Sequence, residues 1–133
     1  MLLLLASLAH TSWGQSSATQ GDDRDPGWKP LMSDRLKLPA YCWAQYDADF
    51  ASRTRTPTPV QMCGVYMNHF CPGLVLLNRA QEINRSVAQR KEYLRGAVHQ
   101  FEYTNRYMPS NCQIKRDVDA ATMQASMLSQ ILR

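Results

Sequence analysis

Four cysteines in a chain of 133 residues are the feature that most limits how this sequence can fold. A chain of this length has room for one domain and hardly two. Cysteines pair as disulfides in oxidising compartments, whereas in the cytosol they stay reduced and more often bind metals or act in catalysis. The compartment therefore decides what the cysteines do, and the N-terminus is the part of the sequence that bears on it.

The N-terminus has features of an export signal. Leu2 to Ala9 form an apolar run of eight residues, well short of the roughly 20 residues that cross a bilayer. Small residues up to Gly14 suit cleavage after that position. No Lys or Arg precedes the run, so the signal is weak or begins upstream, and a short helix packed on the domain is the other interpretation. We expect a signal peptide at 1–14, a flexible polar segment at 15–35 and one helical domain at 36–133.

Export would place Cys42, Cys63, Cys71 and Cys112 in an oxidising space, where they pair. Four cysteines allow three connectivities, and the sequence alone does not choose among them. Cys63 and Cys71 would lie about 12 Å apart along a continuous helix, whereas the Cα atoms of a disulfide lie within about 7 Å of each other. A Cys63–Cys71 bond would therefore need a break in the helix between them, which narrows the three connectivities only slightly. We favour Cys42 with Cys71, joining two neighbouring helices, and Cys63 with Cys112.

Hydrophobic periodicity predicts an all-α fold. Apolar residues recur every three or four positions along two segments, and no run alternates with period two for long. Pro109 ends the first segment, and Ser110 or Asn111 is expected to cap the helix after it. Residues 52–59 are expected to be a loop because two prolines lie two positions apart. The two stripes are Leu94, Ala97, Val98, Phe101 and Met108, and Ile114, Val118, Ala121, Ala125, Leu128 and Leu132.

One segment resembles the second helix of a tetratricopeptide repeat. Ala97, Phe101, Thr104 and Pro109 stand at the offsets where that family has a small residue, an aromatic, another small residue and a closing proline. Residues 73–80 resemble a first helix, but residues 81–92 are too many for a standard repeat turn. The resemblance covers one to one and a half units over residues 72–132. It implies disulfide-stapled helical hairpins arranged as in a tetratricopeptide-type array.

The stretch MNHFCPGLVLLNRA, residues 67–80, is also similar to one in uncharacterised exported bacterial proteins that carry such repeats. Those proteins have a tyrosine–cysteine pair upstream, as Tyr41 and Cys42 are here. The similarity implies architecture and location, and it implies no activity.

Cys63, His69 and Cys71 are the strongest candidates for chemistry, because His and Cys are zinc ligands. Their C-x5-H-x-C spacing matches no common zinc arrangement, and no CxxC or CxxCH motif is present. Phosphate-binding glycine loops, GxSxG and HExxH are also missing. We therefore expect no enzyme activity, catalytic residue, metal or cofactor. A small redox or metal-binding protein centred on Cys63, His69 and Cys71 is the alternative.

The charge is unevenly distributed along the chain. Residues 1–78 hold six basic and six acidic side chains, whereas residues 79–133 hold nine basic and five acidic ones. This excess indicates either a docking face for an acidic protein or anionic membrane surface, or a solvated helix face. The export signal argues against nucleic acid as a partner.

The expected function is that of an exported, periplasmic or extracellular interaction module, an accessory or scaffold subunit that binds another protein of the envelope or of a larger complex. Met123 and Met127 lie off the apolar stripe of the last helix and would leave a second apolar edge uncovered. Self-association through this helix is a further option. The residues expected to make the contacts are Arg90, Arg95, Arg106, Met123 and Met127.

Overall fold

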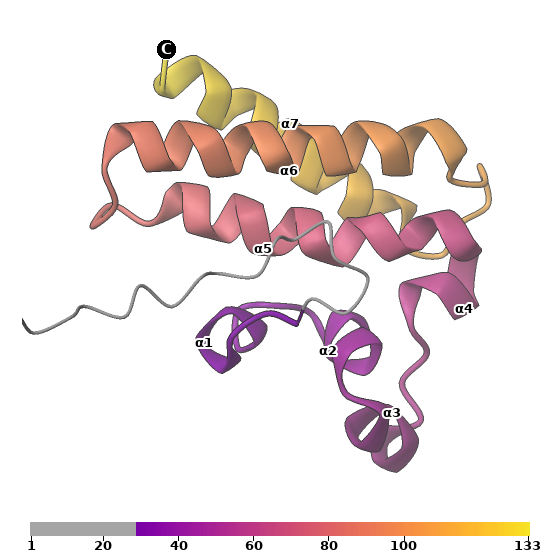
Figure 1. The fold of residues 1–133 in the computed structure, drawn as a ribbon. Coiled ribbons are helices and arrows are strands. Elements are labelled where there is room, and N and C mark those ends of the chain that lie inside the picture. Colours follow the sequence, from indigo (N-terminus) through magenta and orange to yellow (C-terminus); the bar gives the residue numbers. More distant parts are fainter. Residues whose placement is uncertain (1–28) are drawn as a thin grey trace, which may run out of the picture.

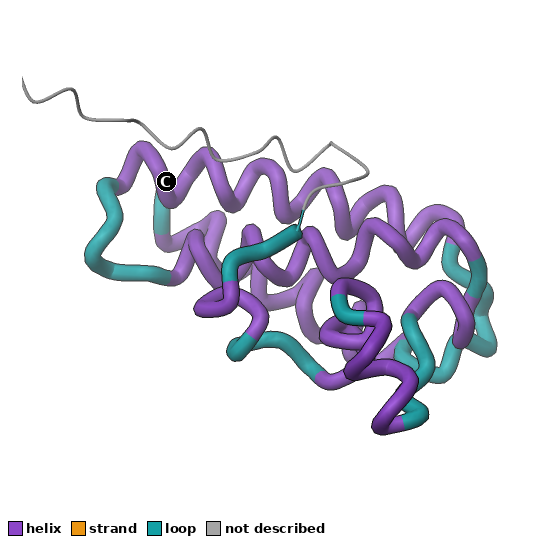
Figure 2. The backbone as a smooth tube through the Cα atoms, turned by 60° about the horizontal axis from the view of Figure 1, so that its bottom comes forward, coloured by secondary structure: helices purple, strands orange, loops and turns teal. Residues whose placement is uncertain are grey.

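The computed structural model describes residues 29–133, and within that range the chain is helix joined by short loops, with no strand (Figures 1 and 2). The all-α prediction is thus confirmed for the described residues. The expected signal peptide, residues 1–14, and residues 15–28 lie outside them. The helices in chain order are α1 (Met32–Arg35), α2 (Ala40–Tyr46), α3 (Ala48–Thr54), α4 (Pro59–Cys63), the 3₁₀ helix η1 (Val65–His69), α5 (Phe70–Gln81), α6 (Val87–Tyr107) and α7 (Lys115–Ile131).

Helices α5 and α6 form an antiparallel hairpin that runs the length of the molecule (Figure 1). Gly73 of α5 allows the close approach, because a Cβ at this position would lie 2.6 Å from Phe101 Cε1 of α6. Ala97, Phe101 and Thr104, which carry the repeat-like pattern, are buried. The predicted stripe of α6 is therefore its packing face.

The turn between α5 and α6 is shorter than the sequence indicated. It spans residues 82–86, because α6 begins at Val87 with a capping box in which Ser86 and Gln89 satisfy each other's backbone N–H groups. The first turns of α6 are polar and exposed, so the apolar stripe does not extend over them and their helical structure was not apparent. The long turn expected at 81–92 is therefore wrong.

Helix α7 packs across the hairpin, mainly on α6 and also on α5 (Figure 1). All six residues of its predicted stripe are buried, from Ile114 to Leu132. Neither Ser110 nor Asn111 caps it, because the helix starts later than expected and Ile114 occupies the N-cap position without a side-chain hydrogen bond. Tyr41 Oη donates a 2.8 Å hydrogen bond to Asp117 Oδ2, which connects α2 with the first turn of α7. Burial and this hydrogen bond raise the pKa of Tyr41 above its usual range.

The short N-terminal helices pack against α5 through a second core of Leu38, Cys42, Cys71 and Val75. The folded part begins before residue 36, because α1 lies within the segment expected to be flexible and its Asp34 is buried. Asp34 Oδ2 lies 2.7 Å from Arg79 Nη2 of α5, and Oδ1 accepts a second hydrogen bond from Nε at 3.3 Å.

The segment 52–59 is only partly a loop. Helix α3 continues to Thr54, and the chain reverses at Arg55, which adopts a left-handed conformation with φ of 54°. Pro59 is the first residue of α4, where its missing N–H costs no helical hydrogen bond. Pro57 thus lies in the loop and Pro59 begins the next helix. The two-residue spacing had indicated that both prolines could not lie inside one helix.

Two disulfides join these layers, and they are the two pairs favoured from the sequence. Cys42 bonds to Cys71, linking α2 to α5, and Cys63 bonds to Cys112, linking the end of α4 to the loop before α7. A break at Gly64, whose φ of 101° suits glycine, separates Cys63 from the helix that carries Cys71.

Candidate interaction surface

The Cys63, His69 and Cys71 constellation does not form one site. Each cysteine belongs to a different disulfide, and none of the four cysteines is free. His69 Nδ1 lies 2.6 Å from Gln100 Oε1, and the imidazole packs against the Tyr103 ring with 4.0 Å between centroids. These contacts give His69 a packing role between η1 and α6. Within residues 29–133 no three His, Cys, Asp or Glu side chains are grouped so that they could hold a metal ion.

The three arginines of α6 do not share one face. Arg95 and Arg106 are three helical turns apart and lie on the same outer side, whereas Arg90 is directed towards α5. Arg90 Nε donates a 2.8 Å hydrogen bond to the Ala80 carbonyl at the end of α5. Arg95 forms an exposed ion pair with Glu92 at 2.9 Å. Arg95 and Arg106 are therefore exposed to a partner, and Arg90 closes the end of α5.

Met123 and Met127 lie together on the outer face of α7. Their exposed fractions are 63% and 54%, and Ile131, one turn further, is 77% exposed. The three side chains follow one another at steps of four on the side of α7 opposite its buried stripe. We call Met123, Met127 and Ile131 the α7 face. It is a line of apolar side chains that no described residue covers.

A groove of about 350 Å³ lies between α6 and the end of α7. Its floor is apolar, with Leu94, Val98 and Leu132, and cationic side chains stand at its edge. Lys91 Nζ reaches the Arg133 carbonyl oxygen at 3.4 Å, which holds the last residue of the chain beside α6. The residues that line the groove are Lys91, Leu94, Arg95, Val98, Ser129, Leu132 and Arg133.

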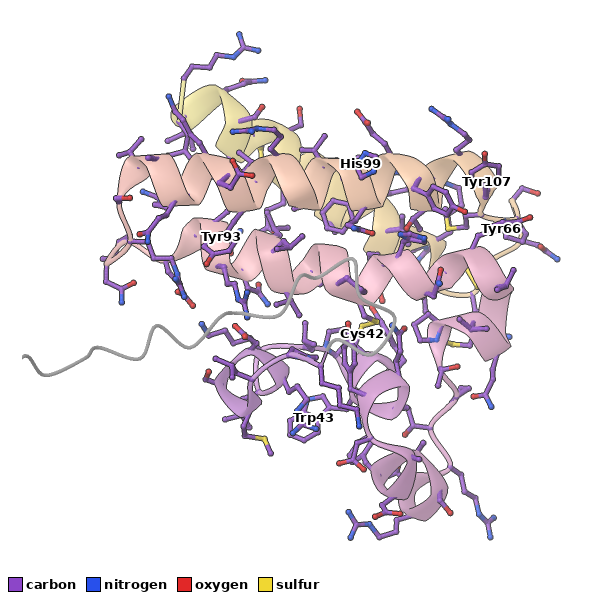
Figure 3. The ribbon with its side chains drawn as sticks, viewed as in Figure 1. Cys42, Trp43, Tyr66, Tyr93, His99 and Tyr107 are labelled. Carbon is purple, nitrogen blue, oxygen red and sulfur yellow. A yellow bond between two sulfur atoms is a disulfide. The ribbon has the colours of Figure 1, made fainter. Side chains whose placement is uncertain are left out.

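A cluster of tyrosines at the other end of α6 was not predicted as a site. Tyr66 and Tyr107 stack with 4.8 Å between their centroids (Figure 3). The centroid of the Tyr103 ring lies 4.9 Å from that of Tyr107. Tyr66 and Tyr107 are both exposed. Their polar tips and large rings are typical of protein interfaces. The four-residue spacing of Tyr103 and Tyr107 was a signal for a shared helical face, but nothing in the sequence placed Tyr66 beside them.

No helix in the described part of the chain is both long and apolar enough to span a membrane.

No family model, no curated protein and no solved structure matches this chain. The assignment of a function therefore depends on the surfaces described above.

Proposed function

We propose that this protein is an exported interaction module, an accessory or scaffold subunit that binds another protein of an envelope or extracellular assembly. The observation that carries the proposal is the α7 face, Met123, Met127 and Ile131. The two disulfides support the location, since bonds of this kind persist in oxidising compartments.

An ordinary surface helix has one apolar stripe, whereas helix α7 has two, one buried and one exposed. One side packs on α5 and α6 and needs no partner to be stable. The other consists of residues that add nothing to the core, and flexible methionines are common on surfaces that adapt to a bound helix. An apolar line of this length on a small domain favours an interaction surface.

The repeat-like pattern supports the same proposal. In helical repeat proteins each unit covers the apolar side of its neighbour, and a terminal unit has a polar outer side. Helix α7 follows the α5–α6 hairpin in the chain and packs across it, yet its outer side is apolar. A partner helix lying along α7 would complete the arrangement.

Paired variants of the full, disulfide-bonded chain test this proposal. Met127→Glu introduces a charge on the α7 face, and Ser126→Glu introduces the same charge on the same helix, outside that face. In affinity capture from native extracts, we expect the wild type and Ser126→Glu to retain the same partner and Met127→Glu to lose it about tenfold or more. If Met127→Glu retains that partner, the α7 face is not the binding surface.

A second copy of the chain is the other occupant that the α7 face could take. Light scattering over a range of concentrations distinguishes the two cases. A concentration-dependent oligomer that Met127→Glu abolishes would assign the face to self-association in place of a different protein.

The structure offers no observation that favours the alternative centred on Cys63, His69 and Cys71. Metal ligation or nucleophilic attack by Cys63 or Cys71 needs a thiolate, and both sulfurs are bonded to other cysteines. The proposed module has no catalytic residue, metal or cofactor.

A further inference from the structure

The positive charge of residues 79–133 is concentrated at one end of the helical bundle. Residues 79–99 carry five basic and two acidic side chains, whereas residues 100–132 carry three of each. Arg133 lies at the same end of the bundle as the start of α6, because the last turn of α7 packs beside Lys91. Figure 1 shows that the α5–α6 turn, the start of α6 and the end of α7 all lie at this end.

Exposed aliphatic side chains stand among these cations. Ile83 in the turn is 89% exposed, and Val87 in the first turn of α6 is 57% exposed. Val87 lies four residues before Lys91 and seven before Leu94, so it lies on the same side of α6 as these two groove residues, nearer the end of the bundle. We call Ile83, Val87, Lys91, Arg95 and Arg133 the basic end.

We propose that the basic end docks on the surface of an anionic phospholipid bilayer. Ile83 and Val87 would enter the boundary between head groups and acyl chains, as the apolar side of a peripheral anchor does. Lys91, Arg95 and Arg133 would contact phosphate groups, and the apolar groove beside them would receive the upper carbons of a lipid.

The composition of the basic end favours a membrane over an acidic protein. The centre of a protein interface is enriched in aromatic residues, methionine and arginine and depleted in lysine. Among the described residues the exposed tyrosines lie in the tyrosine cluster, and the exposed methionines lie on the α7 face and, as Met32, on α1. The basic end instead combines aliphatic side chains with Lys and Arg. Within residues 29–133 neither Lys91 nor Arg95 forms a buried ion pair, because Lys91 contacts the exposed Arg133 carbonyl oxygen and Arg95 pairs with the exposed Glu92. Their charges therefore stay available to anionic head groups.

Co-sedimentation with lipid vesicles tests the charge requirement. The full disulfide-bonded chain is mixed with phosphatidylcholine vesicles, with or without phosphatidylglycerol. Lys91→Gln with Arg95→Gln removes two charges from the basic end, and Arg106→Gln with Arg116→Gln removes two charges from the other end. We expect the first pair to weaken binding to the anionic vesicles by about tenfold and the second by about twofold or less. Both double variants retain residues 1–28, so any contribution of that segment to vesicle binding is the same in both and does not affect the comparison.

The apolar contact is tested by single changes. Ile83→Ser is expected to weaken binding about fivefold, and Val65→Ser, an equally polar change at an exposed valine beside the tyrosine cluster, is expected to leave it unchanged. Equal binding to neutral and anionic vesicles, equal losses from the two charge pairs, or binding only to an acidic protein would overturn the proposal. Met127→Glu should bind vesicles as the wild type does, which separates this test from that of the α7 face.

Discussion

At the scale of single residues, Asp34 and Arg79 show how α1 is held on the domain. Both side chains are buried, and the carboxylate accepts two hydrogen bonds from the guanidinium. Burial opposes the charged guanidinium, but the hydrogen bond and charge of Asp34 outweigh it, and the pKa of Arg79 is raised. The Arg79 guanidinium also lies over the Tyr93 ring, 5.6 Å from its centroid. Removing Asp34 would take away the buried carboxylate that forms two hydrogen bonds with the Arg79 guanidinium.

Asp34→Ala is therefore expected to lower the free energy of unfolding by about 3–5 kcal/mol, measured by urea denaturation. Replacing both partners, with Asp34→Leu and Arg79→Met, removes the buried guanidinium together with its carboxylate and should cost clearly less than the single change. A loss below about 1 kcal/mol for Asp34→Ala would mean that α1 is not docked on α5.

Glu82 gives the fold a weak dependence on pH. A hydrogen bond from Lys37 Nζ at 2.7 Å, together with the nearby Arg85, lowers the pKa of Glu82 in the folded protein. A carboxylate with a lowered pKa contributes stability above the pKa of the unfolded chain and loses it as the pH falls through the folded value. Because Glu82 is near the surface, the contribution should stay below about 1 kcal/mol.

Unfolding of wild type and Glu82→Gln over a series of pH values measures this contribution. The variant should be slightly less stable at neutral pH, and the difference should disappear as the pH falls below about 4. Glu102→Gln is the control, because Glu102 makes no ion pair with any described residue, and it should show no such convergence.

The sequence predicted single residues well where burial depends on helical periodicity. Ala97, Phe101 and the stripe of α7 are buried as their spacing indicated. The sequence could not indicate the burial of Asp34, because the residue that pairs with Asp34, Arg79, is 45 positions away. A lone aspartate is typical of the surface. For the same reason the stacking of Tyr66 on Tyr107 was not predicted.

At the scale of elements, the α5–α6 contact is the closest in the fold. Gly73 and Gly96 both lie in this contact, but their surroundings differ. A Cβ at Gly73 would meet the buried Phe101 ring at 2.6 Å, whereas a Cβ at Gly96 would meet only the end of the Leu76 side chain, at 3.0 Å. A buried ring cannot turn aside, and a leucine methyl group can shift.

Gly73→Ala should lower the free energy of unfolding by about 1–2 kcal/mol, since the clash exceeds the gain in helix propensity. Gly96→Ala gains the same propensity with a milder contact and should lie within about 1 kcal/mol of the wild type. Thermal and urea unfolding of the two variants provide the comparison. Equal stabilities would show that α5 and α6 are further apart than in this structure.

Element boundaries were harder to predict than the elements themselves. The start of α6 was missed because its first turns are polar, and the start of α7 was placed too early because Ser110 and Asn111 are good caps in isolation. The disulfide to Cys112 holds that loop, and the helix begins only after it. Short helices such as α3 depend on tertiary contacts, which local sequence does not reveal.

At the scale of the whole molecule, the two disulfides connect its layers. Cys42–Cys71 closes a sequence separation of 29 and Cys63–Cys112 one of 49. In the loop-closure model each disulfide contributes about 4 kcal/mol to the free energy of unfolding. The contribution of Cys63–Cys112 is slightly larger because it closes the longer loop. A domain built on one hairpin and one further long helix depends on such cross-links more than a longer array would.

Thiol titration of the unreduced protein should find no free cysteine. Replacing either pair by serine should lower the free energy of unfolding by about 2–4 kcal/mol. Two or more titratable thiols in the native protein, together with bound metal, would instead support the redox or metal-binding alternative.

The proposed function depends on the α7 face being a contact surface. Site-specific photo-crosslinking measures this contact directly, with the crosslinker placed at Met127 or at Ser52 on α3, on the opposite side of the molecule (Figure 1). In native extracts we predict one discrete crosslinked protein from position 127 and none from position 52. No product from position 127, or the same products from both positions, would contradict the account.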